Sequence, residues 1–290
     1  MPTPVPPLPL LYLDFVKFSL QEDLGHGDIS TDTLVPPDLR GQALLKAKER
    51  LIICGLTVAE QVFYQVDNQL RFEYLCGDGE QLEPGMVAAR ISGSVNSILK
   101  AERVALNFVQ HLSGIATYVR CFVEKVKDLG VRLVDTRKTL PGFRVLEKYA
   151  VRVGGAANHR FGLSDGVLIK DNHIKACGSV TKAVERARQN LPHVYRVEVE
   201  VRNLEELEEA LEAGAEAILL DNMDVQTLRK AVKMARKKRP QVLLEASGGI
   251  DLENVRAVAE TGVDLISIGK FTHSAPAVDL NLKIVTLETN

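Results

Sequence analysis

Cysteine and tryptophan are scarce in this sequence, and the scarcity limits the classes of protein to which it can belong. Tryptophan is absent, and the four cysteines among 290 residues form no Cys-x-x-Cys pair and show no metal-ligand spacing. We interpret the cysteines as reduced, mostly buried thiols in a reducing compartment, and we expect a cytoplasmic protein.

Long apolar runs and a strong net charge are missing as well. No apolar run reaches the roughly 18–20 residues of a membrane span, and the formal net charge of −2 argues against general binding to nucleic acid. The first 15 residues contain five prolines and no early positive charge, which is typical of an extended arm and not of a signal peptide. We therefore expect neither a membrane nor a nucleic acid as a partner.

What the chain does contain is typical of a globular enzyme, with 46% hydrophobic and 26% charged residues. Residues 41–100 combine alternating strand-like stretches with turn signals such as Gly77-Asp78-Gly79, and they predict an α/β sandwich domain over residues 1–115. Residues 116–275 alternate between strand and helix, which predicts a parallel sheet with helices outside it.

Six strands are predicted in the second domain, fewer than the eight of a regular barrel. We therefore predict an irregular, incomplete parallel α/β barrel of the TIM-like kind, with a doubly wound sheet as the alternative. The predicted strands are Val131–Val134, Gly166–Ile169, Tyr195–Val201, Ala217–Leu220, Val242–Glu245 and Leu265–Ile268. Helices are predicted over Phe143–Val153, Val180–Asn190, Leu204–Ala213, Val225–Lys238 and Leu252–Thr261.

The connection between the two domains is predicted to contain a broken helix. Residues 100–120 place apolar side chains at i, i+3 and i+4 spacing, and Gly114 is expected to break or bend the helix near the domain boundary. Closer to the N-terminus, Asp23, His26 and Asp28 could form a metal site, but a turn held by side-chain hydrogen bonds is favoured.

Polar and charged residues stand at the end of nearly every predicted strand. In a parallel barrel, ligands bind at the carboxyl ends of the strands, and so many polar groups on one rim would be costly to bury unpaired. In chain order the rim holds Asp135, Arg137 and Lys138; His159 and Arg160; Lys170, Asp171 and His173; Glu198 and Glu200; Asp221 and Asn222; Glu245, Ser247, Gly248 and Gly249; and Gly269, Lys270 and His273. The pattern predicts one ligand cavity on this rim.

The two signs of charge separate along the rim. Between Arg137 and Lys170 the sequence has seven basic residues and two acidic ones, a surplus of five in a nearly neutral chain, which indicates a small anionic ligand. Arginine can bind a carboxylate with two hydrogen bonds. Glu200 and Asp221 suit sugar hydroxyls or Mg²⁺, and the glycine-rich turns later in the chain suit a phosphate. The residues therefore predict a di-anionic organic substrate beside a phosphorylated sugar with magnesium.

Several motifs of the chain are similar to those of a known enzyme family. They are Thr136–Thr139 with Pro141-Gly142, Gly154–Arg160 (GGAANHR), Val167–His173 (VLIKDNH), Val197–Glu200 (VEVE), Leu219–Asn222 (LLDN) and Glu245–Ile250 (EASGGI). Together they resemble the quinolinate phosphoribosyltransferases over about residues 10–285. The resemblance implies phosphoribosyl transfer from phosphoribosyl pyrophosphate to quinolinate with decarboxylation, giving nicotinate mononucleotide, pyrophosphate and CO₂ in NAD biosynthesis. It also implies Mg²⁺ and a C-terminal tail, residues 276–290, that packs back on the first domain.

The resemblance further implies roles for particular residues. The expected substrate-binding residues are Arg103, Arg137, Thr139, His159, Arg160, Lys170, Ser247, Gly248, Gly249, Gly269 and His273. The expected catalytic residues are Lys138, Glu200 and Asp221, of which Glu200 and Asp221 would also hold Mg²⁺ through pyrophosphate and water. Arg103 would come from the neighbouring subunit, so a homodimer or a higher oligomer of dimers is expected.

Three other functions stand as alternatives. A related phosphoribosyltransferase could act on nicotinate without decarboxylation, although the surplus of cationic groups favours a di-acid. A non-catalytic phosphosugar-binding barrel would show damaged rim residues, and the sequence shows none. A barrel aldolase would use Lys170 to form a Schiff base.

Overall fold

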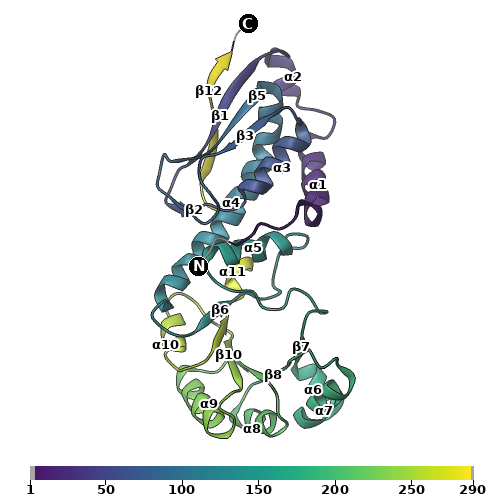
Figure 1. The fold of residues 1–290 in the computed structure, drawn as a ribbon, viewed down its shortest axis with the longest axis vertical. Coiled ribbons are helices and arrows are strands. Elements are labelled where there is room, and N and C mark those ends of the chain that lie inside the picture. Colours follow the sequence, from purple (N-terminus) through teal and green to yellow (C-terminus); the bar gives the residue numbers. More distant parts are fainter. Residues whose placement is uncertain (1–3, 289–290) are drawn as a thin grey trace. The chain divides into compact units, whose positions relative to one another are not determined.

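The computed structural model describes residues 4–288, which divide into two compact units (Figure 1). The first unit contains residues 1–120, 139–155 and 274–290, and the second contains residues 121–138 and 156–273. Each unit has its own sheet, and the two sheets differ in strand direction. The mixed α/β architecture predicted from the alternation of strands and helices is therefore present.

The first unit is built on a four-stranded antiparallel sheet in the order β12-β1-β5-β3. Its strands are β1 (Arg40–Ala47), β3 (Arg71–Tyr74), β5 (Val87–Ser94) and β12 (Leu280–Glu288), and a small separate sheet pairs β2 (Leu51–Ile52) with β4 (Gln81–Leu82). Every second residue of β1 is buried, as expected for a strand with one face on a core. Because β12 pairs with β1 along its length, the C-terminal tail lies on the sheet of the first unit.

Helices cover this sheet and supply most of the core of the first unit. They are η1 (Pro9–Leu11), α1 (Leu13–Leu24), α2 (Ile29–Leu34), α3 (Leu56–Val66), α4 (Val95–Val126), whose last residues enter the second unit, and α5 (Arg144–Gly154). Helix α3 buries one apolar face, which its spacing of Leu56, Ala59 and Phe63 produces. Helix α1 begins at Leu13, directly after the short turn η1.

The predicted break at Gly114 was wrong, because α4 runs unbroken from Val95 to Val126. A Cβ atom at Gly114 would lie against the carbonyl oxygen of Pro276 and 2.9 Å from the Cα of Ala277. The glycine is therefore required where the C-terminal tail crosses the helix, and helix geometry tolerates it. A glycine that permits close packing and one that ends a helix look the same in a single sequence.

Residues 139–155 belong to the first unit, although a boundary at residues 115/116 had been expected. The reason is packing within that unit, where the ring of Phe143 lies 4.7 Å from Phe15 and 5.6 Å from Phe108, measured between ring centroids. Farther along α5, the hydroxyl of Tyr149 donates to Asp78 at 2.8 Å. The segment leaves the barrel after its first strand and returns before its second.

The second unit is a six-stranded, fully parallel sheet in the order β6-β11-β10-β9-β8-β7. Its strands are β6 (Arg132–Val134), β7 (Val167–Ile169), β8 (Val197–Val201), β9 (Ala217–Asp221), β10 (Leu243–Ser247) and β11 (Leu265–Ser267), all within two residues of the predicted bounds. Among the described residues, β6 and β7 are not paired with each other, so the barrel stays open between its first and second strands. The predicted incomplete parallel barrel is confirmed.

Helices lie along the outside of this sheet (Figure 1). They are α6 (Asp171–Cys177), α7 (Val180–Asn190), α8 (Leu204–Glu212), α9 (Val225–Lys238), α10 (Val255–Ala259) and α11 (Lys270–His273). The side chains of Asn203 and Asp224 cap α8 and α9 by accepting from the backbone N–H groups of Glu206 (2.8 Å) and Thr227 (2.7 Å). Helices α6 and α11 were not predicted, because each is too short to show a helical period.

Two smaller expectations have different outcomes. Near the N-terminus, Asp28 caps α2 by accepting from the backbone N–H of Thr31 at 3.0 Å, as the favoured turn interpretation predicted. All four cysteines are free, but only Cys54 is buried, so the expectation of mostly buried thiols was wrong. Across residues 4–288, no helix is both long and apolar enough to cross a bilayer.

Candidate active site

A cavity of about 330 Å³ opens at the carboxyl ends of the parallel strands in the second unit. Residues from all six strands or the turns that follow them line it: Thr136, Arg137, Lys138, His159, Arg160, Leu168, Lys170, Glu200, Leu219, Asp221, Glu245, Ser247 and Ser267. Eight residues that the sequence singled out as substrate-binding or catalytic are among them. The strand ends therefore converge on one cavity, as parallel strands in a barrel require.

The remaining candidate residues lie in three other places. Gly248 and Gly249 follow Ser247 and line an adjacent hollow of about 380 Å³. Gly269 lies between two other candidates, since a Cβ atom there would be 3.1 Å from both the ring of His273 and the side chain of Lys138. The side chains of Lys138 and His273 therefore meet over the backbone of Gly269 at the end of β11.

Thr139 and Arg103 lie outside the lining of this cavity and belong to the first unit. Thr139 accepts a hydrogen bond from Nε of Arg144 at 2.9 Å. Arg103 is exposed on α4. Exposure is what a residue reaching into a neighbouring subunit requires, and the role expected of Arg103 stays a prediction.

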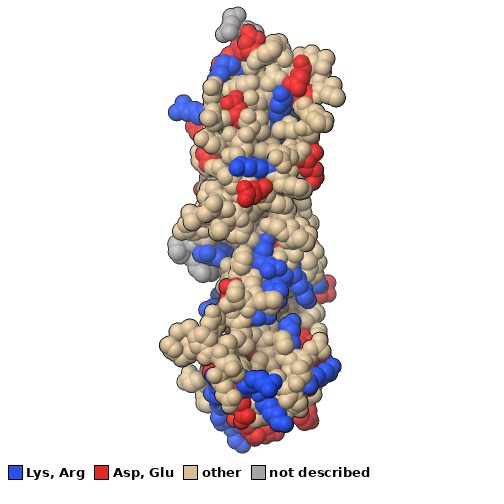
Figure 2. All heavy atoms as spheres, turned by 90° about the vertical axis from the view of Figure 1, so that its right-hand side faces the viewer, with Lys and Arg blue, Asp and Glu red and all other residues tan. Residues whose placement is uncertain are grey.

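The basic run of the sequence divides between the two units. Arg137, Lys138, Arg160 and Lys170 line the cavity, whereas the other three basic residues of the run lie on α5 of the first unit. Figure 2 shows Lys and Arg mixed with Asp and Glu over much of the visible face, apart from one stretch where basic side chains predominate. The charge surplus counted along the chain is therefore smaller at the cavity, where four permanent cations remain.

The segment Asn158-His159-Arg160 is held by a buried carboxylate. Asp135 is fully buried at the end of β6 and accepts from the backbone N–H of His159 and from Nδ2 of Asn158, both at 2.8 Å. The guanidinium of Arg160 donates to the carbonyl oxygen of Gly166 at 2.8 Å. Burial, followed by the charge of Arg137, lowers the pKa of Arg160. Two neighbouring guanidinium groups repel each other and can each bind a carboxylate with two hydrogen bonds, so the pair suits an anionic ligand.

Glu200 and Asp221 form the acidic part of the cavity. Burial raises the pKa of Glu200; the neighbouring Lys170 opposes the increase and Asp221 adds to it. The Nζ of Lys170 lies 3.7 Å from Oε2 of Glu200. Two nearby carboxylates that repel each other, on the wall of an open cavity, fit a hard cation such as Mg²⁺, which prefers oxygen ligands and would relieve the repulsion.

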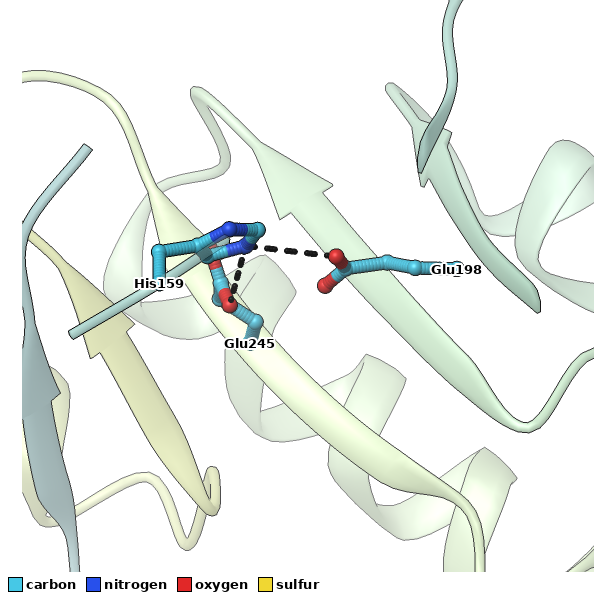
Figure 3. A group of neighbouring side chains, drawn as sticks. All are labelled: His159, Glu198 and Glu245. Carbon is cyan, nitrogen blue, oxygen red and sulfur yellow. Dashed lines mark ion pairs between the residues drawn. The ribbon is translucent and has the colours of Figure 1, made fainter. Parts of the chain in front are cut away.

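On the wall of the cavity, His159 points between Glu198 and Glu245 (Figure 3). Its Nε2 lies 3.2 Å from Oε2 of Glu198 and 3.4 Å from Oε2 of Glu245, whose side chain is 1% exposed. Burial by itself lowers the pKa of His159, but the hydrogen bonds and charges of the two glutamates outweigh burial and raise the pKa to about 10. Glu198 and Glu245 therefore hold a proton on the ring at neutral pH.

A metal ion bound by these three side chains is the weaker interpretation of the same geometry. The backbone N–H of Arg160 lies 2.8 Å from Nδ1 of His159, so a donor and not an acceptor faces this nitrogen. A metal-bound imidazole has the opposite arrangement, in which the nitrogen away from the metal donates. The cluster is better described as an ion-paired histidine than as a metal centre.

Sequence analysis missed two residues of the site, Ser267 and Thr272, and gave Glu245 no particular role. Ser267 and Glu245 line the cavity; among the described residues the buried hydroxyl of Ser267 has no hydrogen-bond partner, whereas Glu245 is ion-paired with His159. Thr272 donates through Oγ1 to the carbonyl oxygen of Lys138 at 2.7 Å and so fixes the turn that carries Lys138. Glu245 had appeared among the rim residues, but Ser267 and Thr272 carry no signal in the sequence beyond their place at a strand end.

The fold and the cavity define a class of protein. An open parallel barrel with a cationic pocket beside paired carboxylates and a glycine-rich loop is a barrel enzyme that binds an anionic substrate next to a phosphorylated one. Two family models match the chain, the quinolinate phosphoribosyl transferase N-terminal domain over residues 28–113 and the C-terminal domain over residues 115–283. The chain belongs to the quinolinate phosphoribosyltransferase family and is a pentosyltransferase of that kind.

Individual relatives agree with the family models. A probable nicotinate-nucleotide pyrophosphorylase (carboxylating) from Synechocystis is 49% identical over 92% of this chain and 90% of its own length. The relative of the same description from Bacillus subtilis is 42% identical over 91% and 90%. Both matches extend over the two units, so the likeness includes the sandwich as well as the barrel.

Solved structures show the same fold. NadC from Streptococcus pyogenes is 41% identical and superimposes with a TM-score of 0.93 over 98% of this chain and 100% of that one. The nicotinate-nucleotide pyrophosphorylase from Francisella tularensis is also 41% identical, with a TM-score of 0.91 and 98% coverage of both chains. Human nicotinic acid phosphoribosyltransferase has a TM-score of 0.66 at 14% identity, which shows a shared fold alone.

Proposed function

We propose that this chain transfers the phosphoribosyl group of phosphoribosyl pyrophosphate to the ring nitrogen of quinolinate, with loss of CO₂, and so makes nicotinate mononucleotide for NAD synthesis. The observation that carries the proposal is the single cavity in which three cations, Arg137, Arg160 and Lys170, face two carboxylates, Glu200 and Asp221. A pyridine diacid needs more positive charge than nicotinate does, so the cation count favours quinolinate over the mono-acid.

The basic side of the cavity binds and orients the diacid. Arg137 and Arg160 offer two guanidinium forks to carboxylates, and Lys170 adds a point charge on the next strand. The His159 imidazole, kept protonated by two glutamates, lines the same side of the cavity. Together these groups hold the pyridine ring with its nitrogen toward the acidic side of the cavity.

The acidic side receives the activated ribose. Loss of pyrophosphate gives the ribose oxocarbenium character, which the carboxylates of Glu200 and Asp221 stabilise electrostatically. These two carboxylates would hold Mg²⁺, which when bound offsets the charge of the leaving pyrophosphate. Lys138, next to Gly269, adds positive charge near the leaving group, and the loop from Ser247 to Gly249 offers backbone N–H groups to a phosphate.

Bond formation needs no nucleophile from the protein, because the pyridine nitrogen itself attacks the ribose. The carbon–nitrogen bond forms as the carbon–oxygen bond to pyrophosphate breaks, so positioning supplies much of the rate. The alkylated ring nitrogen then carries a positive charge. As CO₂ leaves, the electron pair of the broken bond stays on the adjacent ring carbon, where the positive nitrogen stabilises it. A proton at that carbon completes the product.

Residues of both subunits complete the site in this proposal. Arg103, exposed on α4, reaches the quinolinate site of the partner, and the enzyme works as a homodimer in the cytoplasm. Two observations support this arrangement: Arg103 is exposed, and it does not line the cavity of its own chain.

One assay tests the function. Quinolinate labelled in the 2-carboxylate should release CO₂ only when phosphoribosyl pyrophosphate and Mg²⁺ are both present, with one pyrophosphate formed for each CO₂. Turnover of nicotinate at a comparable rate, without CO₂, would favour the mono-acid enzyme. Absence of turnover with either acid, together with tight binding of a phosphosugar, would favour a non-catalytic barrel.

A further inference from the structure

Asn222, the residue after β9, has an unusual backbone conformation beside the site. Its φ of 54° makes it the one non-glycine residue with positive φ among residues 4–288. Asparagine tolerates this left-handed region better than most residues, but the conformation is strained and persists only where surrounding contacts hold it. Asn222 directly follows Asp221, one of the two carboxylates of the cavity.

The contacts of Asn222 join two parts of the site. Its backbone N–H donates to the carbonyl oxygen of Ser247 at 2.8 Å and continues the β9–β10 ladder, in which Asp221 pairs with Ser247. Its side-chain Nδ2 donates to Oδ2 of Asp221 at 2.9 Å. One residue therefore bonds both the carboxylate on the ribose side and the start of the loop on the phosphate side.

The amide of Asn222 also lies against the backbone of Gly248. A Cβ atom at Gly248 would be 2.6 Å from Cγ of Asn222, closer than atoms of real side chains come, and Gly248 itself has a φ of 96°. The bare Gly248 backbone is therefore required for two reasons, its own conformation and the side chain that covers it. The side chain of Asn222 therefore packs directly on the backbone of the loop Ser247–Gly249.

We propose that Asn222 is a positioning residue that clamps the loop Ser247–Gly249 to Asp221 and so fixes the spacing between the ribose-binding and phosphate-binding groups. The inference rests on the proposed function, because that function places the ribose at Asp221 and the phosphate at the loop. A site whose spacing is set before phosphoribosyl pyrophosphate binds avoids the entropy of ordering the loop around it.

Kinetics of Asn222→Gly test the clamp, because glycine keeps the positive φ and removes only the side chain. The KM for phosphoribosyl pyrophosphate should rise by about tenfold or more, as displaced reacting groups cost on the order of tenfold to a hundredfold, while the KM for quinolinate stays within about twofold. Asn190→Gly, at an exposed asparagine whose side chain bonds the carbonyl oxygen of Arg186 in its own helix, is the matched control. Unchanged kinetics in Asn222→Gly, or equal rises in both KM values, would overturn the clamp.

A double-mutant cycle with Gly248→Ala separates the clamp from backbone strain. The left-handed strain of alanine at residue 248 is the same with or without Asn222, so it cancels in the cycle. The clash with the amide is removed by Asn222→Gly, so the second substitution should lower kcat/KM by a smaller factor in that background. Factors that simply multiply would overturn the proposal. Wild-type protein that neither binds phosphoribosyl pyrophosphate nor releases CO₂ would overturn the proposed function and, with it, the clamp.

Discussion

Arg137 and Lys170 place permanent positive charge in the cavity from two separate strand ends. Neither residue supports the core, since Lys170 is exposed and Arg137 is only partly buried. Their replacement therefore affects ligand binding without a large loss of folding free energy.

We predict that Arg137→Ala or Lys170→Ala raises the KM for quinolinate by about tenfold to a hundredfold, because a hydrogen bond to a charged group contributes roughly 1.5–3 kcal/mol. Steady-state kinetics with quinolinate varied provide the measurement. Lys175→Ala is the control, because Lys175 forms a surface ion pair with Asp171 and does not line the cavity. Wild-type KM values in both site variants would count against the binding role.

The ion pairs of His159 with Glu198 and Glu245 should make the stability of the protein depend on pH. The pKa of His159 is raised from an ordinary value near 6.5 to about 10, so stability from its ion pairs is fully present below about pH 6.5 and is lost as pH rises through about 10. Glu245→Gln removes one carboxylate and lowers the pKa of His159, so the loss should begin at lower pH. An NMR titration of the imidazole provides the measurement, with Glu260→Gln on the surface as control. A ring that titrates at the same pH in Glu245→Gln and wild type would contradict the assignment.

Among the elements, the parallel strands were predictable and the exceptions have physical causes. Runs such as Ala217–Leu220 are apolar on both faces, which marks them as buried parallel strands without knowledge of the fold. The excursion of residues 139–155 into the first unit was not predictable, because it depends on long-range contacts such as Phe143 with Phe15. Rim residues could be found from their strand ends. Ser267 could be found only from the cavity that it lines, and Thr272 only from its hydrogen bond to Lys138.

The packing of helix α4 can be tested at Gly114, an interior glycine that lies against the C-terminal tail. Within a helix, alanine is more favourable than glycine by about 1 kcal/mol. Gly114→Ala should nevertheless destabilise the protein, because overpacking against Pro276 costs typically about 1–3 kcal/mol and a clash with backbone is not easily relieved. Urea unfolding provides the measurement. Gly130→Ala is the control, because nothing lies within 4 Å of a Cβ atom there, and it should be neutral or mildly stabilising. A more stable Gly114→Ala would show that the tail can move away.

For the whole molecule, the open question is how many subunits one active site needs. The proposed dimer takes Arg103 from one subunit and the cavity from the other, so each subunit completes the site of its partner. Variants defective in different halves of the site should then complement each other.

We predict that Arg103→Ala and Lys170→Ala are each nearly inactive at a quinolinate concentration near the wild-type KM. Mixing equal amounts under conditions of subunit exchange should restore about a quarter of wild-type activity, because half of the dimers are hybrids with one intact site of two. Activity of the mixture against each variant alone provides the measurement. A mixture no more active than its parents, in a sample shown to exchange subunits, would contradict a site shared between subunits.

In the proposed mechanism, one cavity at the carboxyl ends of the barrel strands binds the pyridine diacid beside the carboxylates of Glu200 and Asp221. A crystal structure of the protein with quinolinate bound tests it most directly. We predict both carboxylates among Arg137, Arg160 and Lys170, with the ring nitrogen toward Glu200 and Asp221. A further cavity, also of about 380 Å³, is lined by Arg132 and Ala217 near the starts of their strands. Quinolinate bound there instead would contradict the proposed mechanism.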